Sequence, residues 1–171
     1  MQTLIALIDL SRPLNGLITA LSVAAGALCT DGSIPPKALI AAALSAALVN
    51  AAGNAFNDLL DIDIDRVNRP ERPLPSLRIA PRTAGIYAAA MAVLGIVIAL
   101  SISPLHALLA AAISALLTVY SAYLKNSVLW GNALVGLLVI VVVLAGATYS
   151  RFFLVSWIGE RVVADIRKAV F

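Results

Sequence analysis

Five long runs of apolar residues, separated by short charged or proline-containing segments, constrain this chain more than any other feature. Each run is close to the roughly 20 residues that a helix needs to cross the hydrocarbon core of a bilayer. Because backbone polar groups inside a bilayer must bond within the chain, such runs predict membrane-spanning helices. The runs cover residues 14–30, 38–57, 84–101, 105–120 and 130–147.

The composition supports this prediction. Apolar residues make up 61% of the chain and charged residues 12%, a balance typical of integral membrane proteins. We therefore predict an all-α membrane bundle of about five transmembrane helices. The net charge of +3 does not indicate a nucleic-acid partner, because the basic residues lie between the apolar runs. A single cysteine, Cys29, excludes an internal disulfide.

The two ends of the chain differ from the apolar runs. Residues 1–13 place apolar side chains among polar ones, which predicts a short helix along the membrane surface rather than a secretory signal. Residues 148–171 carry an apolar stripe at helical spacing, which predicts a C-terminal amphipathic helix.

The main polar feature is residues 54–75, directly after the second apolar run, which hold five of the nine acidic residues. Carboxylates at the end of a membrane helix are costly unless they bind something. At helical spacing, Asn57, Asp61 and Asp65 share one face and Asp58 lies on its flank. Oxygen ligands in this array suit a hard cation such as Mg²⁺.

Arginines follow these carboxylates at once, at Arg66, Arg69 and Arg72. Guanidinium groups bind phosphate oxygens well, so the combination favours diphosphate chemistry. Two simpler interpretations stay open. The stretch could be a solvated loop that obeys the positive-inside rule, or its acids and arginines could pair with each other. A calcium-binding loop is excluded, because Arg66 and Arg72 stand where that loop needs glycine and glutamate.

Residues 57–65, NDLLDIDID, and residues 68–76, NRPERPLPS, resemble the first aspartate-rich motif of UbiA-type membrane prenyltransferases. The resemblance covers about residues 8–146. It is closest to members such as geranylgeranylglyceryl-phosphate geranylgeranyltransferases and chlorophyll synthases. The family usually has glycine where this chain has Leu77.

Two shorter stretches carry the same resemblance. Arg12, Pro13 and Asn15 match an entry to the first span, and residues 120–136 match a segment after the fourth span that contains Lys125. By this resemblance, Asp61 and Asp65 are the catalytic aspartates, and they hold Mg²⁺ with Asn57 and Asp58. The residues that the resemblance implies for diphosphate binding are Asn57, Arg12, Asn15, Arg69, Arg72 and Lys125.

The function implied by the resemblance is Mg²⁺-dependent transfer of an isoprenyl group from a prenyl diphosphate to a lipophilic acceptor in the membrane. The acceptor could be an aromatic ring, a chlorophyllide-type carboxylate or a glyceryl phosphate hydroxyl. The family has a second aspartate motif, Asp-x-x-x-Asp, on a later span. After Glu71 the only acidic residues of this sequence are Glu160 and Asp165, which do not form that pattern. We therefore expect a truncated enzyme that is weak or inactive alone, or one that acts with a second protein half or as a homo-oligomer.

Residues 148–171 resemble a transmembrane segment of an ABC exporter instead. This predicts a division into a prenyltransferase part, residues 1–147, and a foreign helical tail, residues 148–171. The alternative function is accordingly a non-catalytic membrane fragment, either transport-related or half of a split enzyme. No P-loop motif for ATP occurs in the sequence.

The loop charges predict a topology. Basic residues gather in the segments around residues 12, 66–82 and 125, whereas Lys37 stands alone on the other side. The positive-inside rule then places the aspartate motif on the cytoplasmic side of a bacterial or archaeal cell membrane. Five spans would place the tail on the outer side of the membrane, whereas its basic residues favour the cytoplasmic side.

Overall fold

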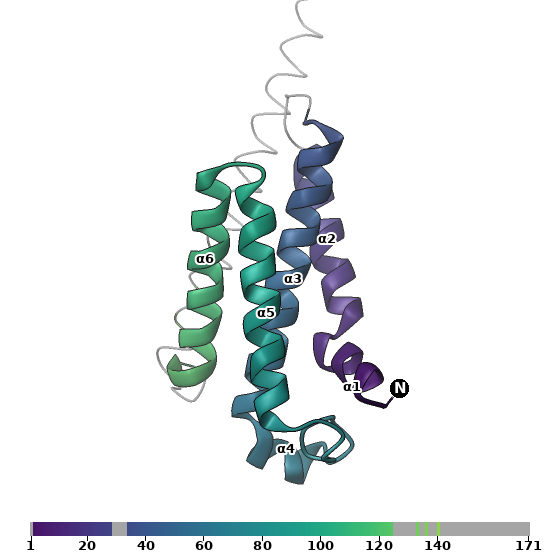
Figure 1. Ribbon diagram of the computed structural model, residues 1–171. Coiled ribbons are helices and arrows are strands. Elements are labelled where there is room, and N and C mark those ends of the chain that lie inside the picture. The colour runs from purple at the N-terminus through teal and green to yellow at the C-terminus, as the bar shows by residue number, and fades with distance from the viewer. Residues whose placement is uncertain (1, 29–33, 125–132, 134–135, 137–139, 141–171) are drawn as a thin grey trace, which may run out of the picture. The chain divides into compact units, whose positions relative to one another are not determined.

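The computed structural model describes residues 2–28 and 34–124, together with 133, 136 and 140. Every regular element in these residues is a helix. The elements are α1 (Gln2–Ser11), α2 (Pro13–Leu28), α3 (Pro36–Leu60), α4 (Ile62–Asn68), α5 (Pro81–Leu100), α6 (Pro104–Val119) and a π-helical turn, η1 (Tyr120–Leu124). Helices α2, α3, α5 and α6 run side by side, and α1 and α4 lie at the same end of this bundle (Figure 1).

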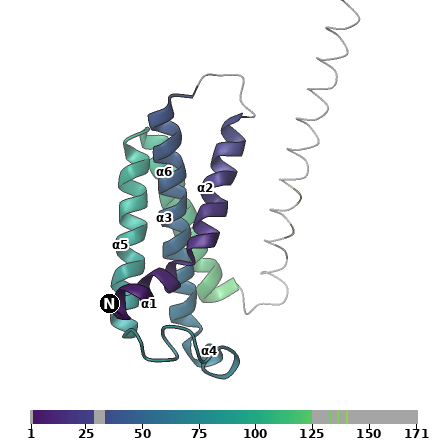
Figure 2. The same cartoon turned by 90° about the vertical axis from the view of Figure 1, so that its right-hand side faces the viewer.

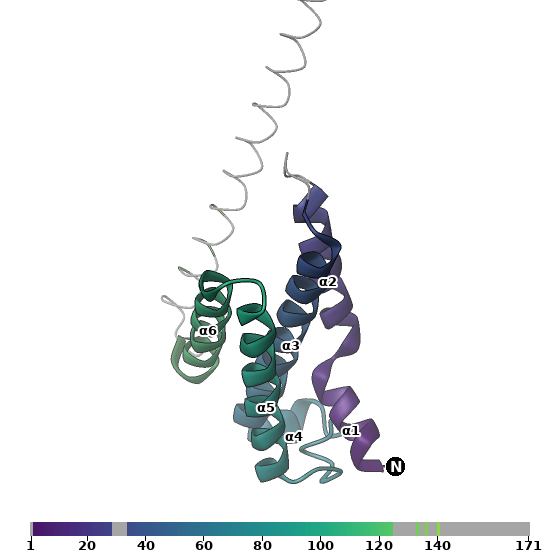
Figure 3. The ribbon, with the colours of Figure 1, turned by 45° about the horizontal axis from the view of Figure 1, so that its top comes forward.

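Helix α3 is the centre of the bundle and packs against α2, α5 and α6. Figures 1 and 3 show α2 and α6 on opposite sides of the α3–α5 pair, and Figure 2 shows α1 and α4 at the same end of the bundle. Small residues allow the close approach of α3 and α5: a Cβ atom at Gly95 would lie 3.0 Å from Val49 and 3.1 Å from the Ser45 carbonyl oxygen. The buried Ser45 hydroxyl donates to the Gly95 carbonyl oxygen at 2.8 Å, which ties the two helices together.

Among the described residues, three helices are long and apolar enough to cross a membrane: Pro36–Leu60, Pro81–Leu100 and Pro104–Tyr123. A fourth span results if Thr3–Ser11 and Pro13–Ala27, which meet at an angle of 42°, count as one. Large apolar side chains cover the outer faces of α2, α5 and α6, where lipid would solvate them. The protein is an integral membrane protein, as predicted. The predicted fifth span, residues 130–147, and the predicted C-terminal amphipathic helix lie outside the described residues.

The break between α1 and α2 lies at Arg12, whose φ of 50° is in the left-handed region. Pro13 then begins α2, because proline lacks an N–H and fits the first turn of a helix. On α1, Ala6 and Leu10 are buried, whereas Leu4 and Ile8 are exposed. The separate short helix predicted for the N-terminus is therefore present, and its apolar outer face fits a membrane surface.

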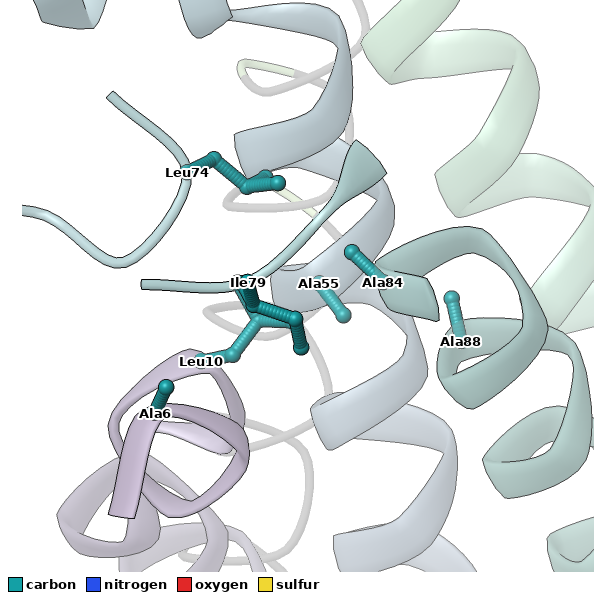
Figure 4. Close-up of a cluster of buried hydrophobic side chains, with 7 residues drawn as sticks. All are labelled: Ala6, Leu10, Ala55, Leu74, Ile79, Ala84 and Ala88. Atoms are coloured by element: carbon teal, nitrogen blue, oxygen red, sulfur yellow. The ribbon is translucent and has the colours of Figure 1, made fainter. Parts of the chain in front are cut away.

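The loop between α4 and α5 folds back onto the bundle. Leu74 and Ile79 of this loop are buried in a cluster with residues of α1, α3 and α5 (Figure 4). The members of this cluster are Ala6, Leu10, Ala55, Leu74, Ile79, Ala84 and Ala88. Arg78 also donates to Asp9 of α1 at 2.8 Å. The loop is thus held against α1 and the end of α3, which sets the position of Arg72 within it.

Candidate functional site

Four charged side chains meet where α3 ends, and we call them the enclosed cluster: Arg12, Asp58, Asp65 and Arg72. Arg12 pairs with the Asp58 Oδ1 atom. One Arg72 nitrogen, Nη1, lies 3.1 Å from the same Asp58 oxygen and 2.6 Å from the Asp65 Oδ2 atom. The carboxylate side chains are almost fully buried, with exposed fractions of 5% for Asp58 and 9% for Asp65.

The local backbone explains how residues far apart in the sequence meet. Helix α3 ends at Leu60 and α4 begins at Ile62, with Asp61 between them at φ −94° and ψ 8°. The amide of Asp65 still donates to the Asp61 carbonyl oxygen at 2.7 Å, and the amide of Arg69 donates to Asp65 at 2.8 Å. The chain therefore keeps helical spacing through the break, so that Asp58 and Asp65, two turns apart, face the same loop.

A continuous helix through the aspartates was the wrong interpretation, because the helix breaks at Asp61. Asp58, which helical projection placed on the flank, is the most enclosed carboxylate of the motif, because both Arg12 and Arg72 pair with it. Asn57 and Asp61 form a pair of their own, in which the Asn57 side chain donates to the Asp61 Oδ2 atom at 3.0 Å. Asp63 faces away from the enclosed cluster and pairs with Arg66 at 2.8 Å on the exposed surface.

The other residues predicted for diphosphate binding are spread out. Asn15 is exposed on the first turn of α2, and Arg69 is exposed after α4. Within the described part of the chain, the Arg69 side chain makes no ion pair. Lys125 lies outside the described residues. Of the six predicted diphosphate contacts, the structure brings Arg12 and Arg72 together in the enclosed cluster.

Within the described residues, no group of three or more acidic, histidine or cysteine side chains is arranged around one point. Two of the predicted magnesium ligands, Asp58 and Asp65, nevertheless converge on a cationic nitrogen of Arg72. Buried carboxylate oxygens that face one cation are the donors that a hard divalent cation prefers. The chemistry of this donor set therefore fits Mg²⁺, with water as the remaining ligands.

Ser11 and Tyr87 join the site through contacts that the sequence did not indicate. The Ser11 hydroxyl bonds to the Tyr87 hydroxyl of α5, and the Ser11 carbonyl oxygen accepts from the Asn54 side chain at 3.3 Å. Asn54 also donates to the Asn50 side chain at 2.9 Å. These bonds fix the α1–α2 break, and with it Arg12, against α3 and α5. The signal that could have indicated this role is the polar stripe of Asn50 and Asn54 within an apolar run.

A cavity of about 390 Å³ lies between α2, α3, α5 and α6 and extends from the α5–α6 turn to Asn50 of α3. Its walls are almost entirely apolar, and Asn50 is one of the few polar residues that line it. Asn50 is eight residues from Asp58 on α3, or about 12 Å along the helix axis. An apolar cavity and a charged cluster thus lie along the same helix, with Asn50 the cavity residue of α3 nearest in sequence to Asp58.

Comparison with known proteins identifies the family. The model of the UbiA prenyltransferase family matches residues 17–159. The digeranylgeranylglyceryl phosphate synthase of Methanopyrus kandleri is 40% identical over 146 residues, which are 85% of this chain and 54% of that protein. The enzyme of the same name from Methanoculleus marisnigri is 38% identical over 145 residues, 85% of this chain and 52% of that protein.

A solved structure supports the same relationship. It is described as digeranylgeranylglyceryl phosphate synthase in membranes, and it matches with a TM-score of 0.74 at 30% sequence identity. The match covers 80% of this chain and 49% of that structure. The chain therefore spans about half the length of the curated relatives it matches.

The comparisons do not support the resemblance of residues 148–171 to an ABC exporter, since the family match itself extends to residue 159. The division at residue 147 stays a prediction. With a matching family model over most of the chain, related archaeal proteins and a matching fold, the chain belongs to the UbiA prenyltransferase family.

Proposed function

We propose that this chain binds a prenyl diphosphate and serves Mg²⁺-dependent transfer of its isoprenyl group to a lipophilic acceptor in the membrane. The observation that carries the proposal is the enclosed cluster at the end of α3, next to an apolar cavity. The relatives are named for digeranylgeranylglyceryl phosphate. We therefore propose the hydroxyl of a prenylated glyceryl phosphate as the acceptor.

The charged residues would bind the diphosphate end. Asp58 and Asp65 would hold Mg²⁺, with Asp61 and Asn57 of the same motif beside them. Bound there, Mg²⁺ would neutralise the leaving diphosphate. Arg12 and Arg72 would donate to its oxygens, and this stabilises the charge that develops as the allylic carbon–oxygen bond breaks. Asn15, Arg69 and Lys125 stay candidates for contacts with the same group.

The apolar parts would hold the hydrocarbon. The cavity along α3 suits an isoprenyl chain, and its dry walls would keep water away from the allylic cation until the acceptor oxygen attacks. The released hydroxyl proton passes to bulk solvent or to the diphosphate. We also propose that the aspartate motif faces the cytoplasm, because the basic residues around it obey the positive-inside rule. The comparisons do not favour the transport-related alternative, and a second protein half or a homo-oligomer stays a prediction.

A transfer assay tests this proposal. The purified chain in lipid nanodiscs is given labelled geranylgeranyl diphosphate and geranylgeranylglyceryl phosphate, with Mg²⁺ or with EDTA. We expect slow formation of the doubly prenylated lipid with Mg²⁺ and none with EDTA.

Two matched variants test whether the activity depends on the enclosed cluster. Asp65→Asn should lower the rate on the order of 100-fold, because it removes a buried charge from the enclosed cluster. Asp63→Asn, an identical change on the exposed surface, should stay within about twofold of the original rate. Product that forms equally with EDTA, or that is unaffected by Asp65→Asn, would contradict the proposal.

A further inference from the structure

The Arg72 guanidinium lies between Asp58 and Asp65, where these carboxylates would hold a metal ion. We propose that the Arg72 guanidinium is an internal cation that holds Asp58 and Asp65 in place, and that a divalent cation displaces it. This inference rests on the proposed function, because it assumes that these two carboxylates receive the cation. Under this inference, the Arg72 side chain pairs with Asp58 and Asp65 before the cation binds. After the cation binds, the same side chain contacts the diphosphate.

The geometry of the contacts supports the first position. A single nitrogen, Arg72 Nη1, is bonded to Asp58 and to Asp65 at 3.1 and 2.6 Å. The two carboxylate oxygens therefore face one point in space, and a positively charged atom occupies it. Arg12 differs, because among the described residues its side chain bonds to Asp58 alone. Arg72 is thus the residue that links the two carboxylates.

Charge and burial require Arg72 to leave. The enclosed cluster holds two carboxylates and two guanidinium groups, so it is neutral as it stands. A divalent cation added to it unchanged would face two guanidinium groups in a poorly solvated site, since the side chains of Asp58, Asp65 and Arg72 are 5%, 9% and 17% exposed. Repulsion between like charges is strong where water is scarce. Binding of the cation is therefore coupled to departure of a guanidinium.

The backbone around Arg72 allows its side chain to move while the loop stays in place. Its amide donates to the Arg69 carbonyl oxygen at 3.1 Å. Its carbonyl oxygen accepts from the Ser76 amide at 3.0 Å and from the Ser76 hydroxyl at 2.6 Å. The loop is also anchored by the buried Leu74. A long, flexible arginine side chain on a fixed backbone can exchange partners without unfolding of the loop.

The direct test uses the unmodified chain. Mn²⁺ is titrated into the purified protein, its binding is followed by electron paramagnetic resonance, and arginine reactivity toward phenylglyoxal is mapped by mass spectrometry at each Mn²⁺ concentration. We expect Arg72 to become at least fivefold more reactive as Mn²⁺ binds, while the exposed Arg66 keeps the same reactivity. Adding inorganic pyrophosphate to the Mn²⁺-bound protein should protect Arg72 again.

Variants give a second readout without any prenyl substrate. Arg72→Gln should bind Mn²⁺ at least tenfold more tightly than the original chain, and pyrophosphate should no longer strengthen that binding. Arg72→Lys keeps the charge and should lie closer to the original chain, and the matched control Arg66→Gln should not differ from it.

Three outcomes decide the inference. Mn²⁺ binding with Arg72 still protected, or no Mn²⁺ binding at millimolar concentration, would overturn it. Release of Arg72 by Mn²⁺ in a chain that transfers no prenyl group would support this inference and contradict the proposed function.

Discussion

Two groups of ion pairs lie within one short stretch of this chain, and solvent reaches them to very different extents. In the enclosed cluster, the Asp58 and Asp65 side chains are 5% and 9% exposed. In the Asp63–Arg66 pair, the side chains are 90% and 58% exposed. The residue types are the same, so the difference comes from Arg12 and from the returning loop with Arg72, which cover Asp58 and Asp65 but not Asp63. The comparison shows that burial by distant segments distinguishes the carboxylates of this motif. Their spacing in the sequence does not determine that burial by itself.

The largest expected difference is in stability. Asp58→Asn removes one charge from a buried network and leaves Arg12 without its carboxylate partner, while Arg72 keeps Asp65. This should cost about 3 kcal/mol of unfolding free energy. Asp63→Asn breaks an exposed pair and should cost no more than about 0.5 kcal/mol. Unfolding by SDS titration in bicelles measures both values. Equal losses in the two variants would show that the enclosed cluster is solvated in the membrane-embedded protein.

A smaller effect is expected for the arginines that pair with these acids. Arg12→Gln should cost about 1–2 kcal/mol, because the Arg12 side chain is 31% exposed and water partly compensates the loss. Arg66→Gln should change stability by less than about 0.5 kcal/mol. The same unfolding titration provides the comparison. A loss for Arg66→Gln as large as that for Arg12→Gln would remove the distinction between the two groups.

The Ser11–Tyr87 bond tests how Arg12 is held in the enclosed cluster. Tyr87→Phe removes the hydroxyl that bonds to Ser11 beside the α1–α2 break, and it should cost about 1 kcal/mol. It should also lower Mg²⁺-dependent binding of pyrophosphate, because Arg12 loses a fixed position. The control is Tyr123→Phe, since Tyr123 is 77% exposed, and thermal unfolding together with calorimetric titration gives both readouts. Unchanged binding in Tyr87→Phe would mean that Arg12 is positioned by Asp58 alone.

An effect as small as that of Tyr87→Phe, but of opposite sign, is expected in the loop that carries Arg72. Leu77 has a φ of 60° and a side chain that is 79% exposed. Leu77→Gly should therefore stabilise the protein by about 1 kcal/mol, because glycine adopts this conformation without strain. Leu77→Ala removes the same apolar side chain but keeps the strain, so the difference between the two variants isolates the backbone contribution. An equal stability for both variants would argue against strain at this position.

The sequence predicted the helices well, because the requirement to bury backbone polar groups in a bilayer leaves a strong apolar signal. Three of the predicted spans correspond to α3, α5 and α6, which are long and apolar enough to cross a membrane, although α3 continues three residues beyond the predicted end, to Leu60. The first predicted span corresponds to α2, which counts as a span only together with α1. The separate N-terminal helix was also predicted. These features depend on local composition, so they can be predicted from a single sequence.

The enclosed cluster was predicted only in part, since its geometry depends on contacts between distant segments. Asp58 is central because Arg12, from the α1–α2 break, and Arg72, from the loop after α4, both pair with it. Arg72 returns to the carboxylates because Leu74 and Ile79 anchor the loop in a core formed by three helices. The pairing of acids with arginines, which the sequence left open as a simpler interpretation, is present and compatible with a binding role.

Binding of geranylgeranyl diphosphate to the purified chain in nanodiscs, measured by calorimetry with and without Mg²⁺, is the most direct experiment on the enclosed cluster. We expect Mg²⁺ to strengthen binding at least tenfold in the original chain and in Asp63→Asn, and to have no effect in a chain that combines Asp58→Asn with Asp65→Asn. Mg²⁺-dependent binding that survives the loss of both enclosed carboxylates would show that the diphosphate is held elsewhere.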